Sequence, residues 1–62
     1  MNIQTIVNEI LNHGYSQKYI AEYVGCSQPT VSDISNGIQK TTSLDIGLKI
    51  LELHKNVFEK AA

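Results

Sequence analysis

The segment of residues 16–37 constrains the fold of this chain more than any other. It places Ala21 five residues after its first residue, Gly25 four residues later and Asn36-Gly37 at its end. A small residue allows a second helix to cross closely, and a glycine supplies the positive φ that a sharp turn between helices needs. The spacing therefore predicts two short helices joined by a turn, which is a helix-turn-helix motif.

Serines mark the starts of both motif helices. Ser16 and Ser27 are suited to accept hydrogen bonds from the first free amides of a helix. Pro29 is tolerated only in the first turn of the second helix, because the amides of that turn have no partner within the helix. Val31 and Ile34 lie on one side of this helix and are predicted to face inward.

Hydrophobic periodicity predicts further helices on both sides of the motif. Apolar residues recur at the spacing of an amphipathic helix over about residues 2–13, and a final helix is predicted over about residues 43–59, with Thr42 or Ser43 as its cap. The sequence contains no strand pattern, repeat or low-complexity segment. We therefore expect residues 1–62 to form a single all-α domain of four to five short helices.

The last predicted helix carries two apolar stripes. At 100° per residue, one stripe contains Leu44, Gly47, Leu48, Leu51 and Phe58. The nearly opposite stripe contains Ile46, Ile50, Leu53 and Val57. Such a helix either lies in the middle of a core or faces its own domain with one stripe and a partner with the other. We expect a homodimer, with an interface formed by Ile46, Ile50, Leu53, Val57 and Phe58.

Length and composition restrict the class of protein. A chain of 62 residues buries only about 60% of the surface that its unfolded form exposes, and its single cysteine, Cys26, cannot form an internal disulfide. Self-association is the remaining route to extra stability. The first residues lack the pattern of a signal peptide and no apolar run is long enough to cross a membrane, so we expect a soluble, cytoplasmic protein.

The motif and its flanks resemble the lambda-repressor and Cro family of phage helix-turn-helix regulators, from about Tyr15 to Leu53. The segment SLDIGLKILEL is similar to the helix that follows the motif in this family. The residues that carry the resemblance are Gln17, Ala21, Gly25, Gln28, Val31, Ile34 and Asn36-Gly37.

The resemblance implies that the second motif helix enters the major groove of DNA with its first residues at the base edges. Gln28 would then be the first base reader, since a glutamine amide binds adenine at two positions. Pro29 could contact a thymine methyl group, and Asp33 could accept a hydrogen bond from cytosine. Thr30 and Ser32 could contact bases or phosphates.

The resemblance also implies contacts with the DNA backbone and a brace between Gln17 and Gln28. The net charge is −1, with five lysines and no arginine, so we expect weak non-specific attraction to DNA. Much of the contact with phosphates would then come from helix N-termini and from neutral polar side chains. The expected backbone contacts are Ser16, Gln17, Lys18, Ser27, Asn36, Gln39 and Lys40.

Together these features predict a Cro-type phage or prophage repressor that binds a pseudo-palindromic operator as a homodimer, with half-sites about 34 Å apart. No small-molecule effector, cofactor or membrane partner is expected. The alternative is a protein-interaction module, or a DNA-binding antitoxin that acts through a protein partner. We do not expect an enzyme, because no constellation of catalytic residues or metal-ligand spacing is present.

Two further features have a structural interpretation. Tyr15, Tyr19 and Tyr23 repeat every four residues, which could form a stacking platform for bases but more often packs rings on neighbouring helices. Cys26 lies in the predicted turn. We expect it to be a packing thiol rather than a nucleophile.

Overall fold

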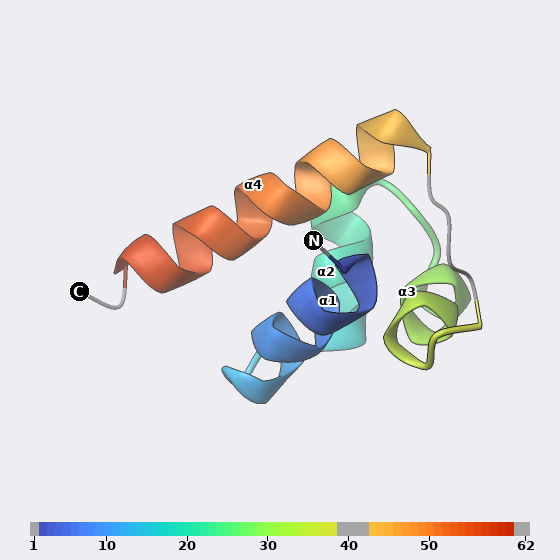
Figure 1. Ribbon diagram of the computed structural model, residues 1–62, viewed down its shortest axis with the longest axis horizontal. Coiled ribbons are helices and arrows are strands. Elements are labelled where there is room, and N and C mark those ends of the chain that lie inside the picture. Colours follow the sequence, from blue (N-terminus) through green and yellow to red (C-terminus); the bar gives the residue numbers. More distant parts are fainter. Residues whose placement is uncertain (1, 39–42, 61–62) are drawn as a thin grey trace.

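The computed structural model describes residues 2–38 and 43–60, which form four helices. These are α1 (Ile3–Asn12), α2 (Gln17–Val24), α3 (Gln28–Ser35) and α4 (Leu44–Lys60) (Figure 1). No strand occurs in these two described ranges. The prediction of a small all-α domain is confirmed.

Short polar side chains start each helix. Asn2 accepts a hydrogen bond from the amide of Gln4 at 2.9 Å, and Ser16 accepts one from the amide of Tyr19 at 3.0 Å. Ser43 begins α4 in the same way, accepting from the amide of Ile46 at 3.3 Å. Thr42, the other predicted cap, lies outside the described residues. Each such cap stabilises a helix by about 1 kcal/mol.

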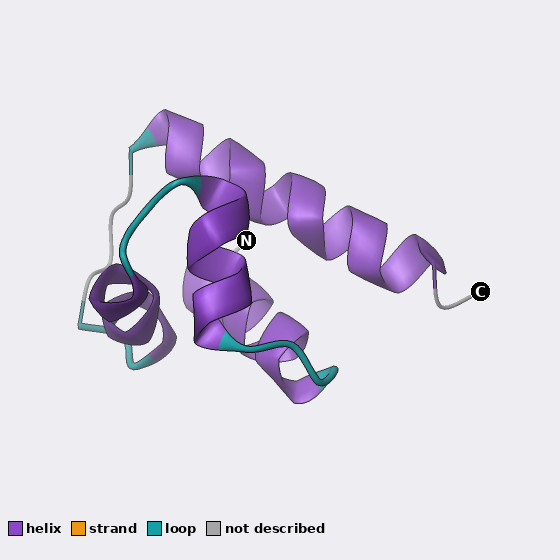
Figure 2. Ribbon diagram, turned by 180° about the vertical axis from the view of Figure 1, so that it is seen from behind, coloured by secondary structure: helices purple, strands orange, loops and turns teal. Residues whose placement is uncertain are grey.

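The longest helix, α4, spans the domain, and the other three helices all lie on one side of it (Figures 1 and 2). Helix α1 packs against α3 and α4, and α2 packs against the same two helices. The α3 helix lies beneath the N-terminal end of α4, as both views show. The arrangement leaves the far side of α4 without a neighbouring helix among the described residues.

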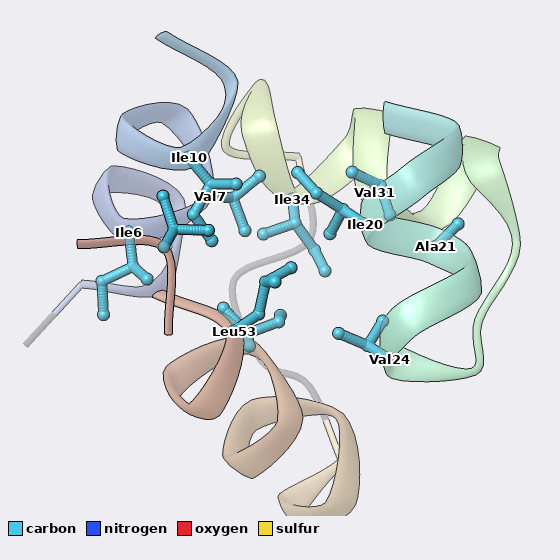
Figure 3. Packing of buried hydrophobic residues seen from close by; sticks show 11 residues of the cluster. Ile6, Val7, Ile10, Ile20, Ala21, Val24, Val31, Ile34 and Leu53 are labelled. Atoms are coloured by element: carbon cyan, nitrogen blue, oxygen red, sulfur yellow. The ribbon is translucent and has the colours of Figure 1, made fainter. Parts of the chain in front are cut away.

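The core is formed by aliphatic side chains from all four helices, which converge in one cluster (Figure 3). Burying a side chain of this size stabilises a fold by about 1.5–3 kcal/mol. None of the buried residues is polar or charged in the part of the chain that the structure describes. The cluster contains Ile6, Val7, Ile10, Ile20, Ala21, Val24, Val31, Ile34, Ile50, Leu53 and Val57.

The predicted dimer interface on α4 is wrong for three of its five residues. Ile50, Leu53 and Val57 are buried in the chain's own core, and Ile46 packs against that core. The three buried side chains are therefore not available to a partner. The reason is that α1 and α2 both pack against α4, and this stripe of α4 enters the core that they form with α3.

Phe58, the fifth residue of the predicted interface, remains 39% exposed. Its ring lies between two histidines, with ring centroids 4.8 Å from His13 and 4.5 Å from His54. The imidazole of His54 also forms a 2.8 Å hydrogen bond with a carboxylate oxygen of Glu9. This cluster joins the C-terminal halves of α1 and α4.

Candidate nucleic-acid interface

The turn between α2 and α3 has the geometry that its sequence predicts. Gly25 ends α2 with a φ of 81°, in the left-handed region that favours glycine. The amides of Gly25 and Cys26 both donate to the carbonyl oxygen of Ala21, at 2.9 and 3.0 Å. These hydrogen bonds give a carbonyl group in the last turn of α2 its partners, and they set the direction in which the chain leaves the helix.

The start of α3 is fixed by a compact set of hydrogen bonds. Ser27 has an extended backbone, and its hydroxyl oxygen accepts from the amide of Thr30 at 3.3 Å. The hydroxyl groups of Ser27 and Thr30 are 2.8 Å apart and share a hydrogen bond. Pro29 occupies the first turn, where its missing amide removes no helical bond. The helix therefore begins at Gln28 with its first turn held in place.

The two faces of α3 differ sharply. Val31 and Ile34 are buried with 1% of their surface exposed, whereas Gln28 and Pro29 are exposed. The structure thus brings the first two predicted base readers together on the outer surface at the start of the helix. This face is polar and carries one charged side chain, the half-buried Asp33.

The remaining predicted base readers are less free. Thr30 and Ser32 are half-buried. The hydroxyl of Thr30 is engaged by Ser27, as described above, and the hydroxyl oxygen of Ser32 accepts a 3.4 Å hydrogen bond from the side-chain amide of Asn36. These two residues therefore shape the helix start and its outer edge as well as bordering the surface.

The predicted contacts with the DNA backbone lie at helix ends. Ser16, Gln17 and Lys18 stand at the start of α2, while Asn36 follows the end of α3 and is exposed. Gln17 is half-buried and Gln28 is exposed, and the brace between them that the resemblance implies stays a prediction. Ser27, also assigned to this role, is the cap of α3. The last two, Gln39 and Lys40, lie outside the described residues.

An anchor for the end of α3 was missed by the sequence analysis. The carbonyl oxygen of Ser35 accepts hydrogen bonds from the side-chain amides of Gln4 at 3.2 Å and Asn8 at 3.1 Å. The Ser35 hydroxyl donates to the side-chain Oδ1 of Asn8 at 2.6 Å. Both amides belong to the polar side of α1. In the sequence, this side has the pattern of an ordinary face exposed to solvent. The bonds fix the position of α3 against α1.

Of the three tyrosines, Tyr15 precedes α2, Tyr19 and Tyr23 lie on it, and Tyr23 links this helix to α4. Neighbouring rings are 5.2 Å apart for Tyr15 and Tyr19, and 6.5 Å apart for Tyr19 and Tyr23. The Tyr23 hydroxyl donates to Glu52 at 2.9 Å and accepts from the side-chain amide of Asn56 at 3.0 Å. The hydrogen bond to the Glu52 carboxylate raises the pKa of Tyr23. This geometry favours the packing interpretation over a stacking platform for bases.

Cys26 is half-buried in the motif turn and packs against the core. Burial raises the pKa of its thiol, because the thiolate loses hydration. We expect iodoacetamide at about pH 8 to alkylate Cys26 more slowly in the folded protein than in urea at the same pH. Mass spectrometry of timed aliquots measures both rates, and equal rates would contradict the packing role.

The described residues include no group of three histidine, cysteine or carboxylate side chains placed to hold a metal ion. No helix within these residues is long and apolar enough to cross a membrane.

Comparison with known proteins identifies the family. The family model described as helix-turn-helix matches residues 8–55, which is more than half of the chain and spans the motif and most of α4. Neither the curated proteins nor the solved structures give a match. The matched segment contains the glycine turn and the capped start of α3. The chain belongs to the lambda-repressor and Cro-like helix-turn-helix family of DNA-binding regulators.

Proposed function

We propose that this protein is a Cro-type repressor that reads an operator in the major groove with the start of α3. The observation that carries the proposal is the arrangement of this helix. Gln28 and Pro29 are exposed at a capped N-terminus, while Val31 and Ile34 hold the opposite face in the core. A rigid helix start with a polar, weakly charged surface suits direct contact with base edges.

The proposed base contacts follow from side-chain chemistry. Gln28 both donates and accepts, so it binds the N6 and N7 edge of adenine. Pro29 offers only apolar surface, which suits the methyl group of thymine. Asp33 accepts from the N4 amine of cytosine and repels sequences that bring a phosphate close. Thr30 and Ser32 border this surface and complete it.

Electrostatics support the use of two copies on one operator. The described part of the motif has only Lys18 as a basic residue, whereas Glu22 and Asp33 are acidic. Few phosphates are neutralised by one copy, so non-specific affinity is low and depends weakly on salt. A pseudo-palindromic operator bound by two copies doubles the number of contacts. The resemblance to phage and prophage regulators is the reason to expect that the bound dimer represses by occupying a promoter.

A second candidate function is favoured by one observation. Leu44 and Leu48 on α4 are 76% and 56% exposed, which is unusual for two leucines one turn apart. A DNA-binding antitoxin would use such a surface to hold a protein partner while α3 contacts DNA. In that case the purified chain would bind its operator as a monomer and would remain monomeric without the partner.

The experiment that tests the proposed function is a binding selection from a randomised DNA duplex pool at about 50 mM salt. We expect an enriched site with two-fold symmetry. Gln28→Ala should lose about 1–3 kcal/mol of discrimination at one base position in each half-site.

The matched control is Lys18→Ala, which removes a charge at the start of α2 without touching α3. It should weaken binding to all sequences about equally and lower the slope of affinity against salt by about one unit. No enrichment from the pool at this salt concentration would overturn the DNA-reading proposal. Uniform weakening by Gln28→Ala would instead remove Gln28 from the base readers.

A further inference from the structure

The C-terminal end of α3 is held both by its own chain and by α1. The last four carbonyl groups of an α-helix have no partner within that helix. In α3, the carbonyl oxygen of Ser35 accepts hydrogen bonds from the side chains of Gln4 and Asn8. Backbone amides that follow the helix bind the other three carbonyl oxygens: Asn36 binds that of Ser32 at 3.0 Å, Ile38 that of Asp33 at 2.9 Å and Gly37 that of Ile34 at 3.1 Å.

Asn8 forms a reciprocal pair of hydrogen bonds with Ser35. Its side-chain nitrogen donates to the Ser35 carbonyl oxygen at 3.1 Å, and its side-chain oxygen accepts from the Ser35 hydroxyl at 2.6 Å. Gln4 adds a third hydrogen bond by donating to the same carbonyl oxygen at 3.2 Å. All three residues, here called the α1–α3 clamp, are half-buried. Hydrogen bonds shielded from water in this way are stronger than exposed ones.

Gln4 also packs against the turn that follows α3. Gly37 has a φ of 76° in this turn, and a Cβ atom placed on it would lie 3.1 Å from both the nitrogen and the oxygen of the Gln4 side-chain amide. The backbone at position 37 therefore approaches α1 more closely than a residue with a side chain would allow. The clamp contacts the last residue of α3 and also the turn by which the chain leaves it.

The clamp supplies a directional restraint that the core lacks. Val31 and Ile34 bury the inner face of α3, but the hydrophobic effect is non-directional and resists a small rotation of the helix only weakly. A hydrogen bond weakens steeply when its angle departs from linearity. The three hydrogen bonds of the clamp therefore set the rotation of α3 at its end, as the turn at Gly25 does at its start.

Small rotations of α3 matter for the contact of Gln28 with a base. Gln28 lies seven residues before Ser35, which is about 10 Å along the helix axis. Because side-chain ends lie about 5–6 Å from that axis, a rotation of about 10° moves them by about 1 Å. A bidentate contact with adenine needs two hydrogen bonds at once, and a shift of this size weakens both.

We propose that Asn8 and Gln4 are positioning residues for the reading of DNA. They hold α3 at the rotation at which the side-chain amide of Gln28 meets both atoms of the base edge. The inference rests on the proposed function and extends it, because it makes selectivity for the operator depend on α1, which does not belong to the motif. Neither residue needs to touch DNA to have this effect.

The first test compares two asparagines of α1. Asn8→Ala removes two of the three hydrogen bonds of the clamp, and Asn12→Ala makes the same replacement at an exposed position one turn further along the helix. Discrimination is measured as the affinity for the selected operator divided by the affinity for the same duplex with the base pair read by Gln28 changed. We expect Asn8→Ala to lower discrimination about tenfold and Asn12→Ala to lower it less than about twofold. Fluorescence anisotropy measures both affinities at a temperature where circular dichroism shows the variants folded.

A merely structural role of Asn8 predicts a different result. Asn8→Ala would then lower the thermal unfolding midpoint, but the folded variant would keep the discrimination of the parent, and that outcome would overturn the proposal. Ser35→Ala is a milder variant, because it removes one hydroxyl and leaves the carbonyl oxygen bound by both side-chain amides. It should fold and lower discrimination about threefold. If Asn8→Ala does not fold, unchanged discrimination by Ser35→Ala overturns the proposal instead.

The second test asks whether Asn8 acts through Gln28. The double variant Asn8→Ala with Gln28→Ala should discriminate at this base pair as Gln28→Ala alone does, because no amide is left to be positioned. Two residues with independent roles would give additive losses. An additional loss in the double variant, as large as that of Asn8→Ala in the parent, would therefore contradict a positioning role.

The failures of the two proposals are distinguishable. If the proposed function is wrong, the duplex pool yields no enriched site, and the positioning role falls with it. If the function holds and the clamp has no such role, the pool yields an enriched site and Gln28→Ala loses discrimination at one base pair. In that case Asn8→Ala behaves like Asn12→Ala, and only the positioning role is overturned.

Discussion

Leu53→Ala is expected to lower the free energy of unfolding by about 2–5 kcal/mol, because it removes a fully buried side chain and leaves a cavity. Leu53 is 1% exposed and belongs to the cluster that joins all four helices. Domains have about 0.05–0.15 kcal/mol of stability per residue, so 62 residues offer little reserve. The variant should lose a large part of this reserve and unfold at a clearly lower urea concentration than the parent. Urea denaturation followed by circular dichroism measures the loss.

The control for this prediction is Leu48→Ala, measured at low protein concentration. The same atoms are removed from the same helix, but Leu48 is 56% exposed, so the loss should stay below about 1 kcal/mol. A second measurement, the mass from sedimentation, distinguishes a role of Leu53 in the core from a role in an interface between copies. If Leu53→Ala or Leu53→Glu shifted only the mass and left the urea midpoint unchanged, Leu53 would belong to an interface between copies and not to the core.

Gly25→Val is the second large effect that we expect, and its cause lies in the backbone. Gly25 has a φ of 81°, a conformation that costs an ordinary L-residue about 1–2 kcal/mol and a β-branched residue more. A Cβ atom at this position would meet nothing within 4 Å, so the Cβ itself adds no steric cost. The loss in stability should therefore come mainly from backbone strain, and calorimetry should show a lower unfolding midpoint.

Gly25→Asn provides the matched comparison, because asparagine adopts the left-handed region more easily than other non-glycine residues. We expect its loss in stability to be clearly smaller than that of Gly25→Val, although its side chain is also bulky. The two variants should rank in the same order for operator affinity, since the turn sets the angle between α2 and α3. An equal loss for both would show that the added side chain, and not the backbone, causes the effect.

Much of the motif was predictable because its determinants are local. Ser16 and Ser27 cap the helices that follow them, and Gly25 takes the positive φ that the turn needs. A serine hydroxyl reaches an amide three residues ahead whatever the rest of the chain does. The positions of Val31 and Ile34 follow from helical periodicity in the same way. These features place Gln28 and Pro29 on the surface.

The anchor of α3 was not predictable from the sequence. Asn8 and Gln4 lie on the polar side of α1, about thirty residues before the Ser35 carbonyl oxygen that they bind. Nothing in their spacing distinguishes them from a solvated face, because hydrogen bonds between distant elements have no local signature. The bond between Tyr23 and Glu52 is of the same kind.

The two apolar stripes of α4 show where the sequence alone reaches its limit. By itself, the sequence determined an all-α domain of four to five helices, the serine caps of the two motif helices, the glycine turn and the presence of two stripes on the last helix. Only the tertiary structure decided which stripe enters the core: Ile50, Leu53 and Val57 do, while Leu44, Leu48 and Leu51 stay outside. The physical reason is that the hydrophobic effect is non-directional. Two rows of similar apolar area gain a similar free energy from burial. Which row is buried therefore depends on how the shapes of α1 and α2 fit against the helix.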